Sequence, residues 1–409
     1  MVHLPLTRDG WLLFATCGVR SFAYGFLSVI LGLYLDATGL STTTIGWIFT
    51  AALAGGAVTT IILTAIVDRF GRKALLIFGA VLMGLAGWVF AVSHNPIFLT
   101  AAAIFGTISP SGKEVGPFLS IEQAILPQTT SDQHRTSVFS AYNLVGSFLG
   151  ALGALAVGLP SALSLPAVAG YRFLIWGYVG CALVMMVLFL FLSPSVEAKA
   201  TTVSHPRKFG VKRSRAIVGK LAGLFALDAF AGGFIVQSLV AYWFYLRYDT
   251  DLNILGGIFF GTNLLAALSF LAAPPIARRF GLLNTMVFTH LPSNFLLLLV
   301  PLMPNVELAV VMLLARNLLS QLDVPTRQSY TMAVVEADER PASAGILSVA
   351  RNAGAAVAPL FTAPILSAPS VGLPFILAGG LKIVYDLWLF VLFRKMRPPE
   401  EASNDTELV

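Results

Sequence analysis

Long apolar stretches alternate with short polar breaks along almost the whole chain. A helical span of a bilayer needs about 20 mostly apolar residues, and most of these stretches reach that length. The pattern predicts twelve transmembrane helices, at roughly 11–35, 43–67, 74–92, 97–127, 136–165, 172–193, 217–246, 252–276, 283–302, 306–335, 342–367 and 371–393. The expected fold is therefore all-α, that of a polytopic membrane protein.

One break between the apolar stretches is longer than the others and rich in basic residues. It runs from Pro194 to Ala216 and divides the predicted spans six and six. The sequence thus predicts an N-terminal six-helix bundle over 1–193, a basic linker over 194–216, a C-terminal six-helix bundle over 217–393 and a polar tail over 394–409. We interpret the basic linker as an orientation signal and a solvated tether.

The composition agrees with a membrane protein and excludes several other classes. Of the 409 residues, 57% are hydrophobic and only 11% are charged, whereas an average soluble domain is about 25% charged. A soluble enzyme, a nucleic-acid-binding module and a disordered chain are therefore excluded. The net charge of +6 implies no nucleic-acid partner, because in a membrane protein the positions of the basic residues matter more than their sum.

The basic residues predict the orientation of the chain in the membrane. With the N-terminus placed in the cytoplasm, eighteen of the 26 Lys and Arg residues fall on cytoplasmic segments, and only Arg172 and Arg247 fall on the outer side. This asymmetry follows the positive-inside rule. We expect a multi-pass protein of the cell membrane, plasma or inner, with both termini and the linker in the cytoplasm.

The two halves share short sequence features at like positions. The turn after the second span reads Asp68-Arg69-Phe70-Gly71-Arg72-Lys73, and the turn after the eighth, 210 residues later, reads Arg278-Arg279-Phe280-Gly281-Leu282-Leu283. A second echo relates Glu114-Val115-Gly116-Pro117 in the fourth span to Asp323-Val324-Pro325 in the tenth. Such matches are typical of parallel repeats around a binding site near the membrane midplane.

The first of these turns resembles the loop motif of the major facilitator superfamily, Gly-x-x-x-Asp-Arg-x-Gly-Arg-Arg/Lys. Residues 64–73 match it except that Thr64 replaces the leading glycine. The resemblance covers nearly the whole chain and implies two pseudo-symmetric six-helix bundles. It also implies a transporter of small solutes, and we expect it to act as a monomer with no cofactor and no metal.

The loop also has a physical interpretation of its own. Gly71 permits a tight reversal between two antiparallel helices, and Asp68 can pair with Arg72 or with a basic neighbour. The resemblance implies a cytoplasmic gate latch, whereas the alternative is loop geometry with positive-inside charge. Glu122, close to the next cytoplasmic turn, is expected to pair with Arg69 or Arg135. The predicted gate residues are Asp68, Arg69, Gly71, Arg72, Glu122 and Arg135.

Charged residues inside the spans are the strongest functional signal. Each costs ~2.5–3.5 kcal/mol or more when unpaired, so such residues must face one another or a wet cavity. They recur at helical spacing, most clearly in the tenth span. Most of them lie in the first, fourth, seventh and tenth spans, which the resemblance implies line a cavity. The predicted substrate or proton pathway is Arg20, Tyr24, Lys113, Glu114, Asp228, Arg316, Asp323, Arg327 and Arg351.

Two pairs at i, i+4 spacing have a structural alternative, mutual neutralisation. For Asp323 and Arg327 both interpretations remain open. For Lys382 and Asp386 we favour neutralisation, because the resemblance implies that the twelfth helix is peripheral. A histidine is a candidate proton relay in the physiological range. For His290 we favour a hydrogen-bonded residue beside Pro292, because the resemblance implies that the ninth helix is also peripheral.

The function predicted is a secondary active transporter working by alternating access, with protons as the coupling ion. Because the cavity holds both signs of charge, it suits a small polar, anionic or zwitterionic organic solute. Glycines of the fifth span, Gly146, Gly150 and Gly153, slightly favour efflux, and uptake symport or proton-independent exchange remain open. The competing classes are an integral-membrane lipid enzyme and a transporter-like sensor, but neither a nucleophile or metal cluster nor a signalling domain is visible in the sequence.

Overall fold

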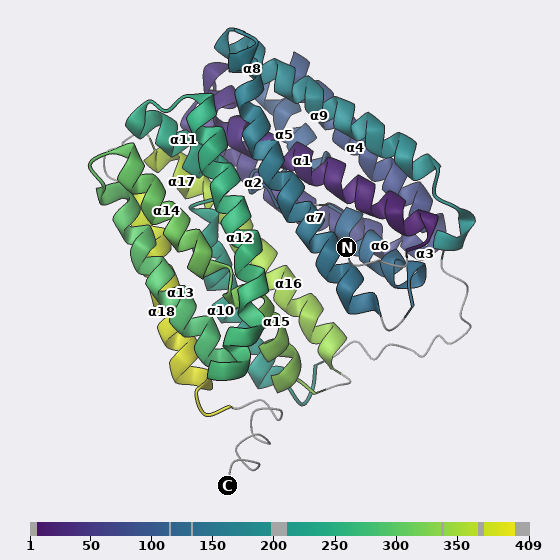
Figure 1. Cartoon of the computed structure of the whole chain (residues 1–409), viewed down its shortest axis with the longest axis vertical. Coiled ribbons are helices and arrows are strands. Elements are labelled where there is room, and N and C mark those ends of the chain that lie inside the picture. The colour runs from purple at the N-terminus through teal and green to yellow at the C-terminus, as the bar shows by residue number, and fades with distance from the viewer. Residues whose placement is uncertain are drawn as a thin grey trace. The chain divides into compact units, whose positions relative to one another are not determined.

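The computed structural model of the chain describes residues 6–113, 116–131, 134–197, 211–336, 339–366 and 372–396. Within these ranges the regular structure is helical, with no strand (Figure 1). The chain forms two compact units. The first comprises Met1–Ser204 with Val236–Asn263, and the second comprises His205–Ile235 with Leu264–Val409.

The first unit contains the first six predicted spans, the second part of the seventh and the first part of the eighth. In it α1 packs against α7, α9 and α11. Its helices are α1 (Arg8–Ala37), α2 (Thr42–Ala65), α3 (Val67–Phe70), α4 (Arg72–Val92), α5 (Pro96–Phe105), α6 (Phe118–Ile125), α7 (Arg135–Leu155), α8 (Leu159–Ala162), α9 (Ala167–Leu190), α11 (Gln237–Tyr248) and the first part of α12 (Leu252–Phe280).

The second unit contains the remaining spans, with α10 packed against α16 and α18, and α13 against α14, α15 and α18. Its helices are α10 (Arg215–Gly233), the second part of α12, α13 (Leu282–Leu299), α14 (Val306–Ser320), α15 (Asp323–Val334), α16 (Arg340–Val357), α17 (Pro359–Ile365) and α18 (Leu373–Phe393).

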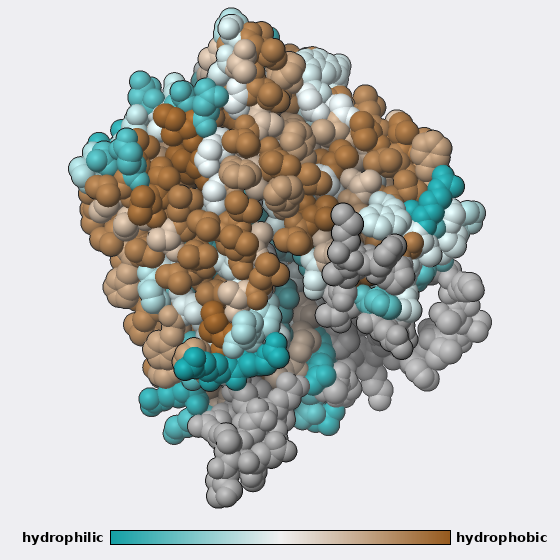
Figure 2. Space-filling model, viewed as in Figure 1, coloured by the Kyte–Doolittle hydropathy of each residue, from teal (hydrophilic) through white to brown (hydrophobic). Residues whose placement is uncertain are grey.

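Eleven helices of the described residues are long and apolar enough to cross a membrane, and Pro96–Phe105 is a shorter apolar helix. Together they account for the twelve predicted spans. Large hydrophobic side chains are exposed along them, including Trp47 and Trp388, each 57% exposed. Figure 2 shows that hydrophobic residues cover much of the surface of the helices on the face in view. Surfaces this apolar are those expected to contact lipid rather than water.

The fourth span is not one continuous helix, which corrects the prediction for 97–127. Helix α5 ends at Phe105 and α6 begins at Phe118. The segment between them contains Gly106, Gly112 and Gly116, and the last two have φ of 68° and 82°. Left-handed backbone of this kind favours glycine and ends a helix. An apolar count detects the span but not this interruption.

The seventh and tenth spans are also interrupted. In the seventh, α10 ends at Gly233 and α11 begins at Gln237; in the tenth, α14 ends at Ser320 and α15 begins at Asp323. Asp323 therefore stands at a helix N-terminus, where the helix dipole favours a negative charge. Backbone that is not helical at membrane depth is tolerated where it is buried in protein or lines a wet cavity.

The predicted repeat of the turn sequences is present in the backbone. Gly71 and Gly281 have φ of 86° and 83°, and each directly precedes a helix, α4 and α13 respectively. In both turns the preceding arginine lies over the adjacent phenylalanine, Arg69 over Phe70 at 5.6 Å and Arg279 over Phe280 at 5.5 Å. The same sequence thus produces the same turn in each half.

Candidate functional site

Asp228 on α10 is the centre of a buried ion-pair network in the second unit. Its side chain forms an ion pair with the Lys382 ammonium of α18, and its Oδ2 accepts a hydrogen bond from Arg327 Nη1 of α15 at 2.9 Å. Arg351 Nη1 of α16 lies 4.0 Å from the same oxygen. Asp228, Arg327 and Lys382 are each at most 7% exposed. One carboxylate therefore holds cations from three other helices.

Arg327 joins this network to the start of α15. Its Nη1 lies 3.3 Å from Asp323 Oδ2, the i, i+4 pair expected from the sequence. The guanidinium also lies over the Phe225 ring, 5.4 Å from its centroid. Cations over aromatic faces are stabilised further where water is excluded. Asp228, Asp323, Arg327 and Arg351 are thus brought together, as their joint assignment to one pathway requires.

The network holds more positive than negative charge. Arg316 on α14 interacts electrostatically with Asp228 and Asp323, yet no ion pair with it is found among the described residues. Its Nε is buried without a hydrogen-bond partner there. Two carboxylates are therefore surrounded by four cations, Arg316, Arg327, Arg351 and Lys382.

The expected neutralisation of Lys382 by Asp386 is wrong. Lys382 pairs with Asp228, whereas Asp386 Oδ1 lies 2.8 Å from His290 Nδ1 on α13. Asn294 Nδ2 donates to Asp386 Oδ2 at 2.8 Å. His290 lies within a continuous helix, since α13 extends through Pro292. Residues of the ninth and twelfth spans, which the resemblance placed at the periphery, thus belong to the buried charges of this unit.

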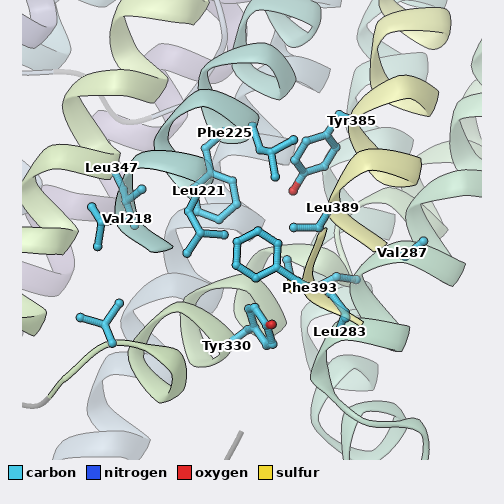
Figure 3. Packing of buried hydrophobic residues seen from close by; sticks show 13 residues of the cluster. Val218, Leu221, Phe225, Leu283, Val287, Tyr330, Leu347, Tyr385, Leu389 and Phe393 are labelled. Carbon is cyan, nitrogen blue, oxygen red and sulfur yellow. The ribbon is translucent and has the colours of Figure 1, made fainter. Parts of the chain in front are cut away.

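An apolar cluster lies on the predicted cytoplasmic side of these charges. Figure 3 shows side chains from α10, α13, α15, α16 and α18 meeting there. Phe225 is one helical turn before Asp228, and Tyr385 directly precedes Asp386; both are at most 2% exposed. The cluster comprises Val218, Leu221, Leu224, Phe225, Leu283, Met286, Val287, Tyr330, Val335, Leu347, Tyr385, Leu389 and Phe393. It keeps water from one side of the network, and ion pairs are stronger where water is excluded.

The first unit contains a separate buried pair, which corrects the expected partner of Glu122. Glu122 on α6 binds Arg20 on α1 through two hydrogen bonds, 3.0 Å from Nη1 to Oε1 and 2.7 Å from Nη2 to Oε2. Tyr142 on α7 donates to Oε2 and Thr16 donates to Oε1. Arg20 and Glu122 are fully buried. The acid is therefore neutralised by Arg20 rather than by Arg69.

The other pathway residues of the first unit are more dispersed. Tyr24 is 1% exposed, and its ring lies 6.4 Å from that of Tyr178 on α9. Lys113 lies in the interrupted part of the fourth span, where Ser109 Oγ donates to its carbonyl at 2.6 Å. Glu114 lies outside the described residues. Lys113 and Glu122 of the fourth span therefore do not share one helix.

The predicted gate loop is fixed by Glu197, a residue that sequence reasoning missed. Its carboxylate accepts hydrogen bonds from the backbone N–H groups of Arg72 at 2.7 Å and Lys73 at 3.1 Å. Arg72 Nη1 also donates to the Val196 carbonyl at 3.1 Å. The side chains of Asp68 and Arg135 are not described. An acid at a helix N-terminus satisfies unpaired donors and favours the dipole.

Glu339 caps α10 in the same manner. It accepts from the backbone N–H groups of Lys212, Arg213 and Ser214 at 2.7–2.9 Å. These donors lower the pKa of the Glu339 carboxyl from 4.5 to about 2, because they stabilise its charged form.

We therefore expect Glu339→Gln to lower the thermal stability at neutral pH. A carboxyl with a lowered pKa stabilises the folded state above its ordinary pKa, and this stabilisation is lost as pH falls from 4.5 towards 2. The Tm difference between Glu339→Gln and the unmodified chain should accordingly narrow across that range. A difference that stays constant from pH 7 to the acid limit would contradict this role.

The sequence shows several of these residues as candidates but does not show their partners. Lys382, Asp386 and His290 are visible as ionisable residues in apolar spans, but their partners lie on other helices. Tyr142 and Glu197 carry no such signal, since a tyrosine in a span and an acid near a loop are both ordinary.

Comparison with known proteins agrees with the architecture. The sequence profile of the Major Facilitator Superfamily matches residues 13–320, which is more than half of the chain. The chain therefore belongs to this superfamily and is a multi-pass membrane protein.

Individual relatives are more distant. An uncharacterized membrane protein of Saccharomyces cerevisiae is 28% identical over 422 residues, covering 95% of this chain and 94% of the relative. The nucleoside transporter NupG has a TM-score of 0.75 at 12% identity, covering 95% of this chain and 99% of its own. A D-xylose-proton symporter has a TM-score of 0.72 at 14% identity, covering 93% and 97%. These two structures share the fold with this chain.

Proposed function

We propose that this chain is a secondary active transporter that moves a small organic anion together with protons by alternating access. The observation that carries the proposal is the excess of cations over carboxylates around Asp228 and Asp323, where Arg316 and Arg351, both half-buried, lack full neutralisation. Buried charges are costly unless they are paired. An anionic substrate would supply the missing negative charge.

In this proposal the cations of the network have two roles, substrate binding and control of the local electrostatic potential. Arg316 and Arg351 bind the carboxylate or phosphate group of the substrate, because guanidinium groups bind such oxygens through paired hydrogen bonds. Arg327 and Lys382 are held by Asp228 and set the local potential. The interruptions at Gly233 and at Ser320 allow the helices that carry these residues to bend between states.

Proton coupling and direction are parts of the same proposal. The D-xylose-proton symporter shares this fold, so the architecture is compatible with proton coupling. Gly146, Gly150 and Gly153 had slightly favoured efflux, but they face α1 closely: a Cβ at Gly153 would lie 2.0 Å from the Phe22 carbonyl oxygen. Close packing of α7 on α1 accounts for glycine there, so we propose symport, with efflux as the alternative.

The anion proposal is tested with Arg316. In liposomes, Arg316→Gln should weaken half-saturation by an anion in counterflow about tenfold or more, since a hydrogen bond to a charged group contributes ~1.5–3 kcal/mol. Arg316→Lys should recover part of the loss. The exposed Arg279→Gln serves as the matched control and should behave as the unmodified chain. Anion counterflow that Arg316→Gln leaves unchanged would refute the assignment.

A further inference from the structure

We propose that His290 and Asp386 together form the binding site for the coupling proton. Lys382, which is attracted to both Asp386 and Asp228, links the charge of this site to the network around Asp228. That this proton is coupled to transport rests on the proposed function. The proton site itself is defined by geometry within the second unit. It differs from the expectation from sequence, in which the substrate or proton pathway included Glu114 and Asp228 but neither His290 nor Asp386.

The pair is buried and closely held. Nδ1 of His290 lies 2.8 Å from Oδ1 of Asp386, and Asn294 occupies the other carboxylate oxygen at 2.8 Å. His290 is 4% exposed, while Asp386 and Asn294 are fully buried. The Tyr385 ring stands edge-on to the imidazole at a centroid distance of 6.0 Å. A histidine joined to one carboxylate can gain or lose a proton with little movement of heavy atoms.

Asp228 is less suited to carry the proton. It forms ion pairs with Lys382 and Arg327, both buried. Protonation of Asp228 would leave the buried Lys382 without its ion-pair partner and Arg327 with Asp323 alone, which is strongly unfavourable. Asp386, in contrast, has no lysine or arginine ion pair among the described side chains. The cation closest to it is His290, and Lys382 acts on it at longer range.

The charged and titratable groups facing the pair come from four helices. Lys382 and Tyr385 belong to α18, and Asp228 on α10 acts on Asp386 as a like charge. On α15, Arg327 and Asp323 act on the neighbouring Tyr385, and on α16 Arg351 acts through Asp228. The other helices packed on the pair add little. Helix α14 carries Glu307, which is exposed, and Arg316, which interacts electrostatically with Asp228 and Asp323. Helix α17 has no ionisable residue.

Proton binding at the pair changes the balance of the whole network. With neutral imidazole and an ionised Asp386, the pair has a charge of −1, and one proton taken from water makes it neutral. Lys382 is one turn from Asp386 on the same helix and is attracted to both Asp386 and Asp228. Once Asp386 is neutralised, the network around Arg316 and Arg351 is more positive by one charge, so an anion binds more tightly. By linkage, a bound anion favours the proton equally.

The test compares the pH dependence of anion exchange in liposomes for the full chain and Asp386→Asn, using labelled succinate and benzoate as probes. Exchange by the unmodified chain should weaken as pH rises between about 5 and 8, and acid-driven accumulation should exceed the equilibrium level. In Asp386→Asn, exchange should be independent of pH and driven accumulation lost; His290→Gln should lose the pH dependence as well. The exposed Asp251→Asn is the matched control, since asparagine can still cap the following turn.

Two outcomes separate this proposal from the proposed function. A pH profile in Asp386→Asn that matches the unmodified chain would overturn the proton site while leaving anion transport intact. If the unmodified chain moves neither probe, the site is tested in nanodiscs by pH-difference infrared spectra. A carboxylic-acid band that disappears in Asp386→Asn would support the proton site, and an unchanged spectrum would overturn it.

Discussion

Replacing Asp228 with alanine is expected to prevent the chain from folding stably. The substitution removes the carboxylate that pairs with Lys382 and Arg327 and lies 4.0 Å from Arg351. Removing one partner of a buried ion pair costs about 3–5 kcal/mol because the other charge stays buried and unpaired. Here Lys382 loses its ion-pair partner and Arg327 keeps only Asp323, and a cost of this size is a large part of the whole stability of many domains.

The measurement is the Tm and the folded yield of Asp228→Ala in detergent. A matched control is Glu307→Ala, since Glu307 is exposed in the first turn of α14 and its loss should change stability by less than about 0.5 kcal/mol. Combining Asp228→Ala with Lys382→Met should recover part of the stability, since one unpaired cation is removed. If Asp228→Ala folds with the Tm of the unmodified chain, Asp228 is not the centre of the network.

A second large effect is expected from Glu122→Ala in the first unit. Arg20 would then keep a fully buried guanidinium whose two carboxylate hydrogen bonds are gone. We expect a loss of about 3–5 kcal/mol for the reason given for Asp228. Because the pair is sealed from solvent, the loss should depend little on salt concentration.

The double variant Arg20→Met/Glu122→Leu distinguishes the pair from its individual charges. Replacing a buried ion pair by apolar residues of similar volume is often neutral or stabilising. The double variant should therefore be more stable than Glu122→Ala, as measured by Tm, and it should still transport if the pair is structural. A double variant that folds but no longer moves any anion would show that Arg20 and Glu122 are needed for transport and not only for stability.

The buried pairs of the two units lie on corresponding spans of the two halves, but the acid and the cation are exchanged. In the first unit the cation Arg20 is on the first span and the acid Glu122 on the fourth. In the second unit the acid Asp228 is on the seventh span and the cation Arg327 on the tenth. The first pair is fully satisfied by Tyr142 and Thr16, whereas the second is embedded among additional cations. This asymmetry is why we place anion binding in the second unit.

Much of the fold was predictable because each span is a local property. A run of apolar residues is read from the sequence without knowledge of its neighbours, and the turn at Gly71 recurs at Gly281 because the same residues make the same turn. The interruption of the fourth span was missed for a related reason. Its glycines lie within an apolar run, so a count of apolar residues is insensitive to them.

The pairing of charges was harder to predict than their positions. The tenth-span residues Asp323 and Arg327, for which the sequence left both interpretations open, do form an ion pair, since the helix itself places them together. The equally spaced Lys382 and Asp386 did not pair, because α10 and α13 offer each a closer partner. Spacing along one helix shows which side chains are able to meet. It does not show what the adjoining helices present to them.

The most direct test is flux through the purified chain in liposomes with an imposed pH gradient. Labelled organic anions, neutral sugars and organic cations are compared at equal concentration, with the gradient acid outside and then abolished by an uncoupler. We predict that at least one anion accumulates on the alkaline side, that the uncoupler abolishes the accumulation, and that the cations do not accumulate. Accumulation of cations or sugars but no anion, or no flux of any solute, would contradict a proton-coupled anion transporter.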